Sequence, residues 1–210
     1  MIIGLVGFIG SGKGTVADIL CENYSFKKES FAAGVKDAAS VIFNWDREML
    51  EGDTRESREW REKPDPWWSE KFGYDFTPRK ALQWIGTEAG RDIFHTDLWI
   101  LSLMRRIKPT ENYVIADVRF PNEMQRIKDM GGFIVWVRRG QLPEWFDTAL
   151  QPGSPGMTKY PEVHPSEYSW IPFHDLVDFD IKNDYTLDVL KDDVFQMYEK
   201  FSYELDGVKL

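Results

Sequence analysis

The sequence contains one cysteine, Cys21, among 210 residues. An intrachain disulfide and a thiolate metal cluster within one chain are therefore excluded, and we expect Cys21 to be a small buried residue on the first helix. The three histidines, His95, His164 and His174, have no metal-ligand spacing and define no Ser-His-Asp arrangement. We therefore expect them to be capping or loop residues.

Long apolar runs are also absent. None approaches the roughly 18 residues that a membrane span needs, and the run 2–6 follows no basic leader. We therefore expect a cytoplasmic protein without a membrane partner. Basic residues are outnumbered, because 26 Lys and Arg against 35 Asp and Glu give a formal net charge of −9. This charge opposes binding of polymeric nucleic acid, although local arginines can still bind a small anion.

The chain length suits one α/β domain with a proper core, so we expect a single domain over residues 1–210. Apolar runs bounded by turn residues predict strands at 2–6, 26–32, 113–118, 133–137 and 176–181. Helical patterns lie at 13–23, 35–43, 78–94, 97–107, 122–130 and 187–203. The alternation predicts a three-layer α/β/α fold with a mostly parallel, five-stranded sheet and ligands at the carboxyl ends of its strands.

Two segments interrupt this alternation. Residues 44–76 are rich in charge and tryptophan, and residues 140–175 contain six prolines. Connections of this length are usually lids, binding loops or disordered segments. We interpret both as mobile elements over the site, an acceptor-side insertion and a lid, with plain surface insertions as the alternative.

Capping residues support the predicted helix ends. Thr77 and Thr96 are expected to cap helix N-termini, with Pro78 at the first helical position. Gly131 and Gly132 are expected to end the helix before them.

The strongest motif is Gly-Phe-Ile-Gly-Ser-Gly-Lys-Gly-Thr at residues 7–15, directly between the first strand and the first helix. Its glycines let backbone N–H groups converge on phosphate oxygens, Lys13 would bridge the β- and γ-phosphates, and the helix N-terminus favours anions. This pattern predicts a P-loop NTPase fold. Gly14 separates Lys13 from Thr15, as in adenylate-kinase-like nucleoside monophosphate kinases, and Thr15 remains a candidate for phosphate or Mg²⁺ binding. A dinucleotide-binding fold would not explain Lys13.

An acidic residue and several arginines follow at later strand ends. Asp117 lies near the carboxyl end of the predicted strand 113–118, where P-loop enzymes place a residue that organises Mg²⁺, directly or through water. A helix-capping or turn role is the alternative for Asp117. Guanidinium groups grip phosphate at two points and stabilise charge during phosphoryl transfer. The candidates are Arg79, Arg91, Arg119, Arg138 and Arg139.

Taken together, these residues resemble the T-even type of bacteriophage deoxynucleoside monophosphate kinase, within the P-loop nucleoside monophosphate kinase superfamily. The resemblance spans nearly the whole chain. Besides the P-loop, the ordered blocks are 31–38 (FAAGVKDA), 79–87 (RKALQWIGT), 117–123 (DVRFPNE), 137–140 (VRRG), 164–167 (HPSE) and 183–184 (ND). The chain departs from the T-even pattern in being shorter, in carrying Phe8 and Ile9 within the phosphate loop, and in its central insertion.

The resemblance implies roles for individual residues. Lys36, Asp37 and Gln83 would border the acceptor, Gln83 would bond a base edge, and Trp84 or Trp60 would stack on the base. Arg119 would lie close to the transferring phosphates, and Asn183 near the ATP adenine. The expected dNMP-binding set is Lys36, Asp37, Arg79, Gln83, Trp84, Arg91, Arg119 and Glu167. The expected ATP-binding set is Gly10, Ser11, Gly12, Lys13, Gly14, Thr15, Arg138 and Asn183. Lys13, Arg119, Asp117 and Arg138 are the expected catalytic residues, with Thr15 and Asp117 as Mg²⁺ ligands.

The hypothesis is direct in-line transfer of the ATP γ-phosphoryl group to a deoxynucleoside monophosphate in deoxynucleotide biosynthesis, with Mg²⁺. The setting would be the host cytoplasm if the chain is phage-encoded. A kinase for a nucleoside, a ribonucleotide or a coenzyme precursor remains the first alternative, and a nucleotide-dependent switch the second. A GTPase would need Asn-Lys-x-Asp, which does not occur. The sequence is compatible with a homodimer and does not fix the accepted bases.

Overall fold

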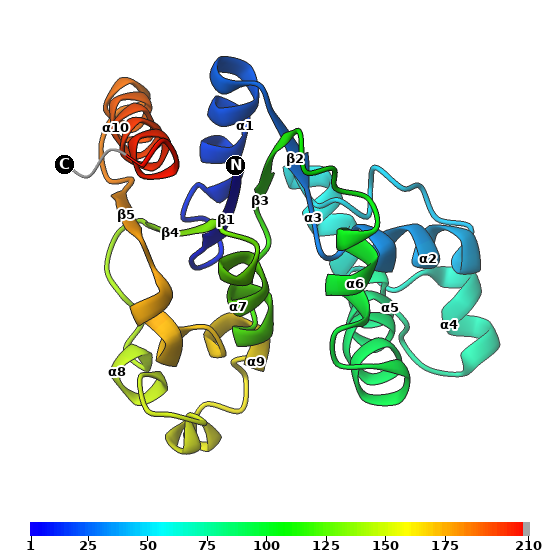
Figure 1. Ribbon diagram of the computed structural model, residues 1–210. Helices are drawn as coiled ribbons and strands as arrows, with labels where there is room; N and C mark the ends of the chain where they lie inside the picture. Colours follow the sequence, from blue (N-terminus) through cyan, green and yellow to red (C-terminus); the bar gives the residue numbers. More distant parts are fainter. Residues whose placement is uncertain (208–210) are drawn as a thin grey trace. The chain divides into compact units, whose positions relative to one another are not determined.

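In the computed structural model, which describes residues 1–207, five parallel strands form one sheet (Figure 1). The strands are β1 (Ile2–Val6), β2 (Phe26–Glu29), β3 (Asn112–Ile115), β4 (Phe133–Arg138) and β5 (Phe179–Lys182). Their order across the sheet is β2-β3-β1-β4-β5. The central strand, β1, is apolar and almost wholly buried, as expected for a strand covered on both faces.

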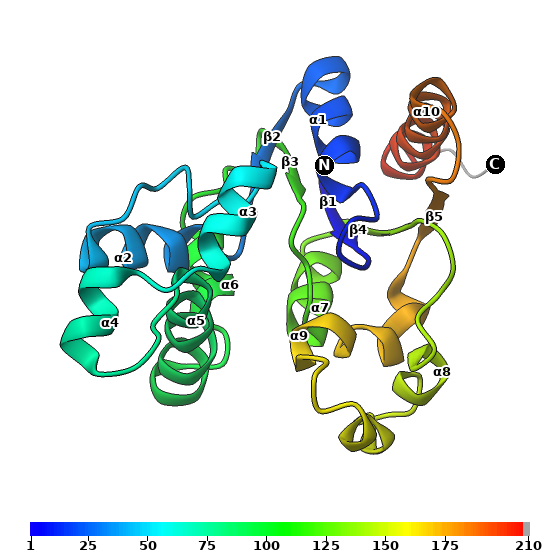
Figure 2. The ribbon, with the colours of Figure 1, turned by 180° about the vertical axis from the view of Figure 1, so that it is seen from behind.

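Helices cover both faces of this sheet. Helices α1 (Lys13–Tyr24) and α10 (Leu187–Leu205) lie side by side in both ribbon views (Figures 1 and 2). They share a buried cluster with Ile3 and Leu5 of β1. Helix α7 (Pro121–Asp129) packs on the opposite face, where Ile127 approaches Gly4, because successive strand residues face opposite ways. The predicted α/β/α layering is confirmed.

The contacts within the chain divide it into two compact units. Unit 1 consists of Met1–Ser30 and the chain from Ile107 onward, and it holds the sheet. Unit 2 is Phe31–Arg106. Its elements are α2 (Ala33–Phe43), α3 (Arg55–Glu62), α4 (Pro66–Phe72), α5 (Pro78–Gln83), the π-helix η1 (Trp84–Phe94) and α6 (Leu98–Met104).

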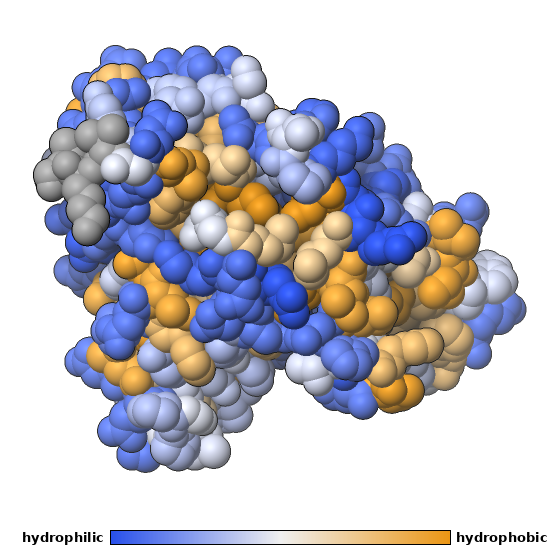
Figure 3. Space-filling view, in the orientation of Figure 1, coloured by the Kyte–Doolittle hydropathy of each residue, from blue (hydrophilic) through white to orange (hydrophobic). Residues whose placement is uncertain are grey.

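Unit 2 has its own apolar core, built around Trp45, Leu50 and Phe76. Aromatic rings surround this core, and the centroids of Trp45 and Trp60 lie 5.9 Å apart. Other apolar side chains, such as Val41 and Ile42, stay exposed. The space-filling view shows apolar residues among hydrophilic ones at the surface (Figure 3). Because the Trp60 ring contacts Trp45 of the core, Trp60 packs against that core.

The segment 44–76 differs from the expected irregular insertion, because it contains helices α3 and α4. Thr54 accepts a hydrogen bond from the Ser57 N–H, and Asp65 accepts one from the Trp68 N–H. These caps satisfy backbone donors that a helix N-terminus leaves free. The segment 140–175 also contains short helical elements, namely α8 (Phe146–Ala149), η2 (Pro155–Lys159), α9 (Pro165–Tyr168) and η3 (Ile171–Leu176).

Most predicted helix boundaries lie within a few residues of the observed ones. Thr77 caps α5 as predicted, through the Lys80 N–H, and α7 ends immediately before Met130, Gly131 and Gly132. The prediction for Thr96 is wrong, because α6 begins at Leu98 and His95 Nδ1 accepts the Asp97 N–H at 3.0 Å. The N-cap residue of α6 is Asp97, one position later than predicted.

Two further elements differ from prediction. Strand β5 begins at Phe179 rather than Leu176, because residues Ile171–Leu176 form the 3₁₀-helix η3. The predicted helix 78–94 changes from α5 to the π-helix η1 at Trp84. The indole Nε1 of Trp99 donates to the Gly86 carbonyl at 2.7 Å, and a side chain inserted at a helical carbonyl is a common cause of such irregularity. Cys21 lies on α1 but is only partly buried.

Candidate active site

The phosphate loop, residues 7–15, connects the central strand β1 to α1 in unit 1. The sheet order puts this connection at the carboxyl end of β1, between β3 and β4. Ser11 is only 3% exposed, and its Oγ has no hydrogen-bond partner among the described residues. Thr15 is exposed in the first turn of α1. The loop therefore offers polar groups that its own fold leaves uncommitted.

Lys13 folds back over this loop. Its Nζ donates to the carbonyl oxygens of Gly7 at 2.6 Å and Phe8 at 3.0 Å. Burial, and after it the nearby Arg119 cation, lower the pKa of Lys13 to about 8, against the opposing effect of Glu167 and Asp117. Lys13, Arg119, Glu167 and Asp117 therefore share one electrostatic environment, as the sequence-based assignment of their roles requires.

Asn183 contacts the loop from the segment after β5. Its Nδ2 donates to the Ser11 carbonyl at 2.9 Å, and its backbone N–H donates to the Arg138 carbonyl at 2.8 Å. Gly12 has φ +100, and a Cβ at this position would lie 2.2 Å from Asn183 Nδ2. Glycine is therefore required at residue 12 both by the backbone conformation and by the close approach of the amide.

Asp117 lies just beyond β3, where the sequence predicts it. Its Oδ2 accepts a hydrogen bond from Ser30 Oγ at 2.7 Å. Ser30 follows β2, which pairs with β3, so the two residues meet at the same edge of the sheet. The contact orients the carboxylate, while its role in binding a metal stays a prediction.

Arg119 is held by residues of the 140–175 insertion. Its Nη1 donates to Glu167, in a short ion pair, and to Ser166 Oγ at 3.3 Å. Its backbone N–H donates to Glu123 Oε2 at 2.8 Å, and Glu123 is 2% exposed. His164 Nδ1 lies 2.8 Å from Ser166 Oγ. The structure thus brings Arg119, Glu167 and the 164–167 block together, as the family resemblance implies.

Arg138 forms a two-point ion pair rather than pointing into open space. Its Nε lies 2.8 Å from Asp180 Oδ1, and its Nη2 lies 2.7 Å from Asp180 Oδ2. The guanidinium also lies over the Trp136 ring, 5.3 Å from its centroid. A role on ATP requires Arg138 to leave Asp180. Arg139, its neighbour, is exposed.

The insertion packs against the phosphate loop through Phe8. The Phe8 ring centroid lies 5.5 Å from that of Trp145, 6.1 Å from Phe146 and 5.7 Å from Trp170. Trp170 is 2% exposed. The residue that departs from the T-even pattern therefore forms part of an aromatic contact between the loop and the insertion.

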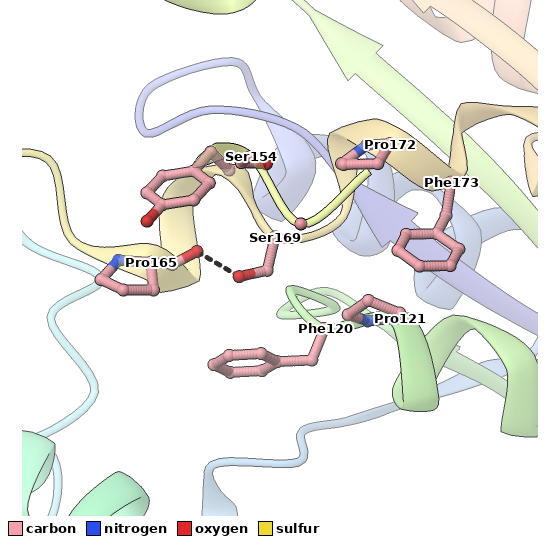
Figure 4. Close-up of a pocket in the computed structure, with 9 residues that line it drawn as sticks. Phe120, Pro121, Ser154, Pro165, Ser169, Pro172 and Phe173 are labelled. Carbon is pink, nitrogen blue, oxygen red and sulfur yellow. Dashed lines mark hydrogen bonds between the residues drawn. The ribbon is translucent and has the colours of Figure 1, made fainter. Parts of the chain in front are cut away.

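A pocket of about 350 Å³ lies between the start of α7 and the insertion (Figure 4). Phe120 and Pro121 face Pro172 and Phe173 across it. Its other lining residues include Tyr168 and Ser169. Because rings and prolines dominate the lining, the pocket offers few groups that could bind phosphate.

In unit 2, two of the predicted acceptor residues, Lys36 and Asp37, belong to one ionic network. Lys36 and Arg47 both bond Glu51, and Arg47 Nε donates to Asp37 Oδ1 at 2.6 Å. Burial alone would raise the pKa of Glu51, but the hydrogen bonds from Lys36 and Arg47 outweigh it and lower that pKa. Glu51 is therefore a stable anion that neutralises this cluster.

The remaining predicted acceptor residues lie on α5 and η1. Arg79 Nε donates to Glu62 Oε1 at 2.6 Å. Trp84 is 41% exposed, and Lys80 Nζ lies 4.9 Å from its ring centroid. Gln83 is the last residue of α5, and Arg91 Nη1 donates to the Thr96 carbonyl at 3.2 Å. Their binding roles stay predictions.

Sequence reasoning missed several residues of these clusters. Ser30, Arg47, Glu51 and Glu62 partner the predicted residues Asp117, Lys36, Asp37 and Arg79. Each contact other than Arg47–Glu51 joins different structural segments, so no local spacing reveals it.

Within the described residues, no helix is both long and apolar enough to cross a membrane.

The parallel sheet, the loop after its central strand and the lysine at the start of α1 define a P-loop kinase. No family model matches the chain. It is 38% identical to a protein of Acanthamoeba polyphaga mimivirus assigned as a deoxynucleotide monophosphate kinase, over 66% of this chain and 74% of that protein. It is 29% identical to the deoxynucleoside-5′-monophosphate kinase of Escherichia phage T5, over 61% of this chain and 72% of that one. The chain belongs to the deoxynucleoside monophosphate kinase family, which confirms the resemblance.

Among solved structures, the shikimate kinase of Aquifex aeolicus is 12% identical, with a TM-score of 0.46 over 96% of this chain and 98% of that one. The dephospho-CoA kinase of Campylobacter jejuni is 16% identical, with a TM-score of 0.40 over 95% of this chain and 96% of that one.

Proposed function

We propose that the protein transfers the γ-phosphoryl group of ATP to the 5′-phosphate of a deoxynucleoside monophosphate, which yields the deoxynucleoside diphosphate and ADP. The observation that carries this proposal is the 38% identity to the mimivirus protein across 74% of that protein's length. The phosphate loop and Lys13 supply the donor side of the same reaction. The substrates are cytoplasmic metabolites, so we expect the protein to act in the cytoplasm.

In unit 1, Lys13 and the loop N–H groups bind the ATP phosphates. Lys13 then exchanges its bonds to the Gly7 and Phe8 carbonyls for bonds to phosphate oxygens. Arg119 stabilises charge on the transferring group. An acceptor phosphate is already ionised near neutral pH, so in-line attack needs no general base and no covalent enzyme intermediate.

Thr15 and Asp117 are the residues that would hold Mg²⁺. Their hydroxyl and carboxylate oxygens are the hard donors that Mg²⁺ prefers, and this ion usually keeps several waters and takes few protein ligands. Asp117 also lies close enough to Lys13 to influence its pKa. When bound, Mg²⁺ would neutralise phosphate charge.

In unit 2, the acceptor-side residues are Lys36, Asp37, Arg79, Gln83, Trp84 and Arg91. Arg79 supplies a phosphate-binding guanidinium, and the exposed face of Trp84 supplies a surface on which a base can stack. Gln83 supplies an amide for a base edge.

A coupled assay tests this function. Purified protein is given ATP and Mg²⁺ with each deoxynucleoside and ribonucleoside monophosphate in turn, and ADP release is recorded beside a Lys13→Ala variant. We expect turnover with one or more deoxynucleotides and its loss in the variant. ADP release that no monophosphate stimulates would refute the proposal.

A further inference from the structure

Several cations of unit 2 form ion pairs with its own carboxylates. Ion pairs join Lys36 and Arg47 to Glu51, and Arg79 to Glu62. Arg61, on α3, differs. Among the described residues no carboxylate forms an ion pair with Arg61, although its side chain is partly buried.

The few contacts that Arg61 does make are weak. Its Nη1 lies 3.4 Å from the Glu51 carbonyl oxygen and 3.5 Å from that of Leu50, at the long limit of hydrogen bonding. Its Nε is buried and has no hydrogen-bond partner within the described residues. A guanidinium offers five N–H donors, so most of this group's capacity is unused.

The position of this guanidinium is nevertheless built into the fold. Gly52 has φ +71, and a Cβ there would lie 2.0 Å from Arg61 Nη2 and 2.1 Å from its Cζ. Only glycine lets the guanidinium lie against the backbone at this point. The arginine is thus held in place by packing, and the nearby carboxylates of Glu62, Asp53 and Glu51 act on it without forming an ion pair among the described residues.

A second arginine lies nearby. Arg79 is on α5, which packs against α3, and its partner Glu62 directly follows Arg61. Burial and the Arg79 cation lower the pKa of Arg61, and they outweigh the opposing effect of Glu62, Asp53 and Glu51. Two neighbouring cations, one of them partly buried with an unpaired donor, cost free energy that a bound anion would recover.

We propose that Arg61 binds the phosphate group of the deoxynucleoside monophosphate together with Arg79, because its partly buried guanidinium is held against Gly52 and forms no ion pair with a carboxylate among the described residues. This inference rests on the proposed function and names a residue of its acceptor site. A dianionic phosphomonoester suits this pair, since its oxygens can accept hydrogen bonds from the guanidinium groups of Arg61 and Arg79 at once.

The test is a binding measurement that separates the phosphate from the rest of the ligand. Calorimetry measures the affinity of the accepted deoxynucleoside monophosphate for the wild type, Arg61→Gln and Arg61→Lys. Ligand-detected NMR compares the corresponding deoxynucleoside, which lacks the phosphate. Arg58→Gln is the matched control, because Arg58 lies on the same helix but is exposed, and its guanidinium donates to the Asp53 carbonyl at 3.2 Å.

We expect Arg61→Gln to weaken monophosphate binding about 10- to 100-fold, the usual effect of losing charge-assisted hydrogen bonds. Arg61→Lys should fall between this variant and the wild type, and Arg58→Gln should change affinity less than twofold. Deoxynucleoside binding should not change. The melting temperature of Arg61→Gln should not fall, because the substitution removes an unpaired, partly buried charge.

Unchanged monophosphate affinity in Arg61→Gln would overturn the inference while leaving the proposed function intact. Equal losses for the monophosphate and the deoxynucleoside would also overturn it, because they would indicate a structural role. If Arg61→Gln fails to fold, the same comparison with Arg61→Lys decides. If the wild type binds no deoxynucleoside monophosphate, the proposed function fails, and the inference fails with it.

Discussion

Lys13 of unit 1 and Lys36 of unit 2 contact different kinds of acceptor. In unit 1, the side chain of Lys13 bonds the carbonyl oxygens of Gly7 and Phe8 in its own loop, at 2.6 and 3.0 Å. In unit 2, Lys36 bonds the carboxylate of Glu51, which Arg47 shares. A neutral carbonyl is a weaker competitor for an ammonium group than a carboxylate is.

This difference determines which groups an anion must displace when it binds to each unit. A phosphate displaces only neutral acceptors from Lys13, so the loop of unit 1 is poised for a highly charged ligand. In unit 2, a ligand must compete with Glu51 and Glu62, so the carboxylates set how tightly the acceptor binds. The following substitutions test this contrast, beginning with the largest expected effect.

Lys13→Ala should lower kcat/KM for ATP by about 10²- to 10³-fold, because a positioned charge that stabilises the transferring phosphoryl group is lost. Steady-state kinetics with the coupled assay measure the change. Lys191→Ala, an exposed lysine on α10, serves as the control and should behave as the wild type. An equally active Lys13→Ala enzyme would contradict the role of the loop.

Arg79→Gln should raise the KM for the deoxynucleoside monophosphate about 10- to 100-fold and leave the KM for ATP unchanged. Glu62→Gln should have the opposite effect on the acceptor KM, because it removes the carboxylate that competes for Arg79. Both are measured with the second substrate saturating. A change confined to the KM for ATP would show that the contrast between the units is wrong.

The affinity for ATP should weaken as pH rises. Because burial lowers the pKa of Lys13 in the free protein to about 8, the lysine loses its charge above that pH, whereas bound phosphate would keep it protonated. Affinity is therefore nearly complete at pH 7, where Lys13 is mostly protonated, and should fall about tenfold between pH 7 and pH 9, with proton uptake on binding. Calorimetry in two buffers of different ionisation enthalpy measures both. In Lys13→Arg this dependence should disappear; its persistence would assign the titration to another group.

Asn183→Ala should give the smallest effect, a rise of about 3- to 10-fold in the KM for ATP, since it removes one neutral hydrogen bond to the Ser11 carbonyl. Amide hydrogen exchange at residues 7–15 should become faster in the variant. Unchanged exchange with a raised KM would instead indicate direct contact with ATP.

The sequence could predict features that rest on local patterns. The strand β1, the phosphate loop and α1 follow from an apolar run, converging glycines and Lys13, and they were predicted with nearly their observed bounds. The Thr77 cap was predicted for the same reason. Helices α3 and α4 were missed even though Thr54 and Asp65 are ordinary capping residues, because the charge and tryptophan content of 44–76 suggested an insertion.

Features that depend on distant contacts could not be predicted. The π-helix η1 depends on Trp99, which bonds Gly86 from the next helix. The Ser30 contact to Asp117 requires β2 and β3 to be neighbours. Arg61 has no distinguishing feature in the sequence, because its Nε, which has no hydrogen-bond partner among the described residues, is buried by packing near Gly52.

The most direct test of the account follows the transferred group itself. The protein is incubated with Mg²⁺, ATP labelled at the γ-phosphate and each deoxynucleoside monophosphate, and the products are separated by chromatography. We expect the label to appear in the β-phosphate of a deoxynucleoside diphosphate, and we expect Lys13→Ala to abolish formation of this labelled product. Label found only in inorganic phosphate, with every acceptor, would contradict it.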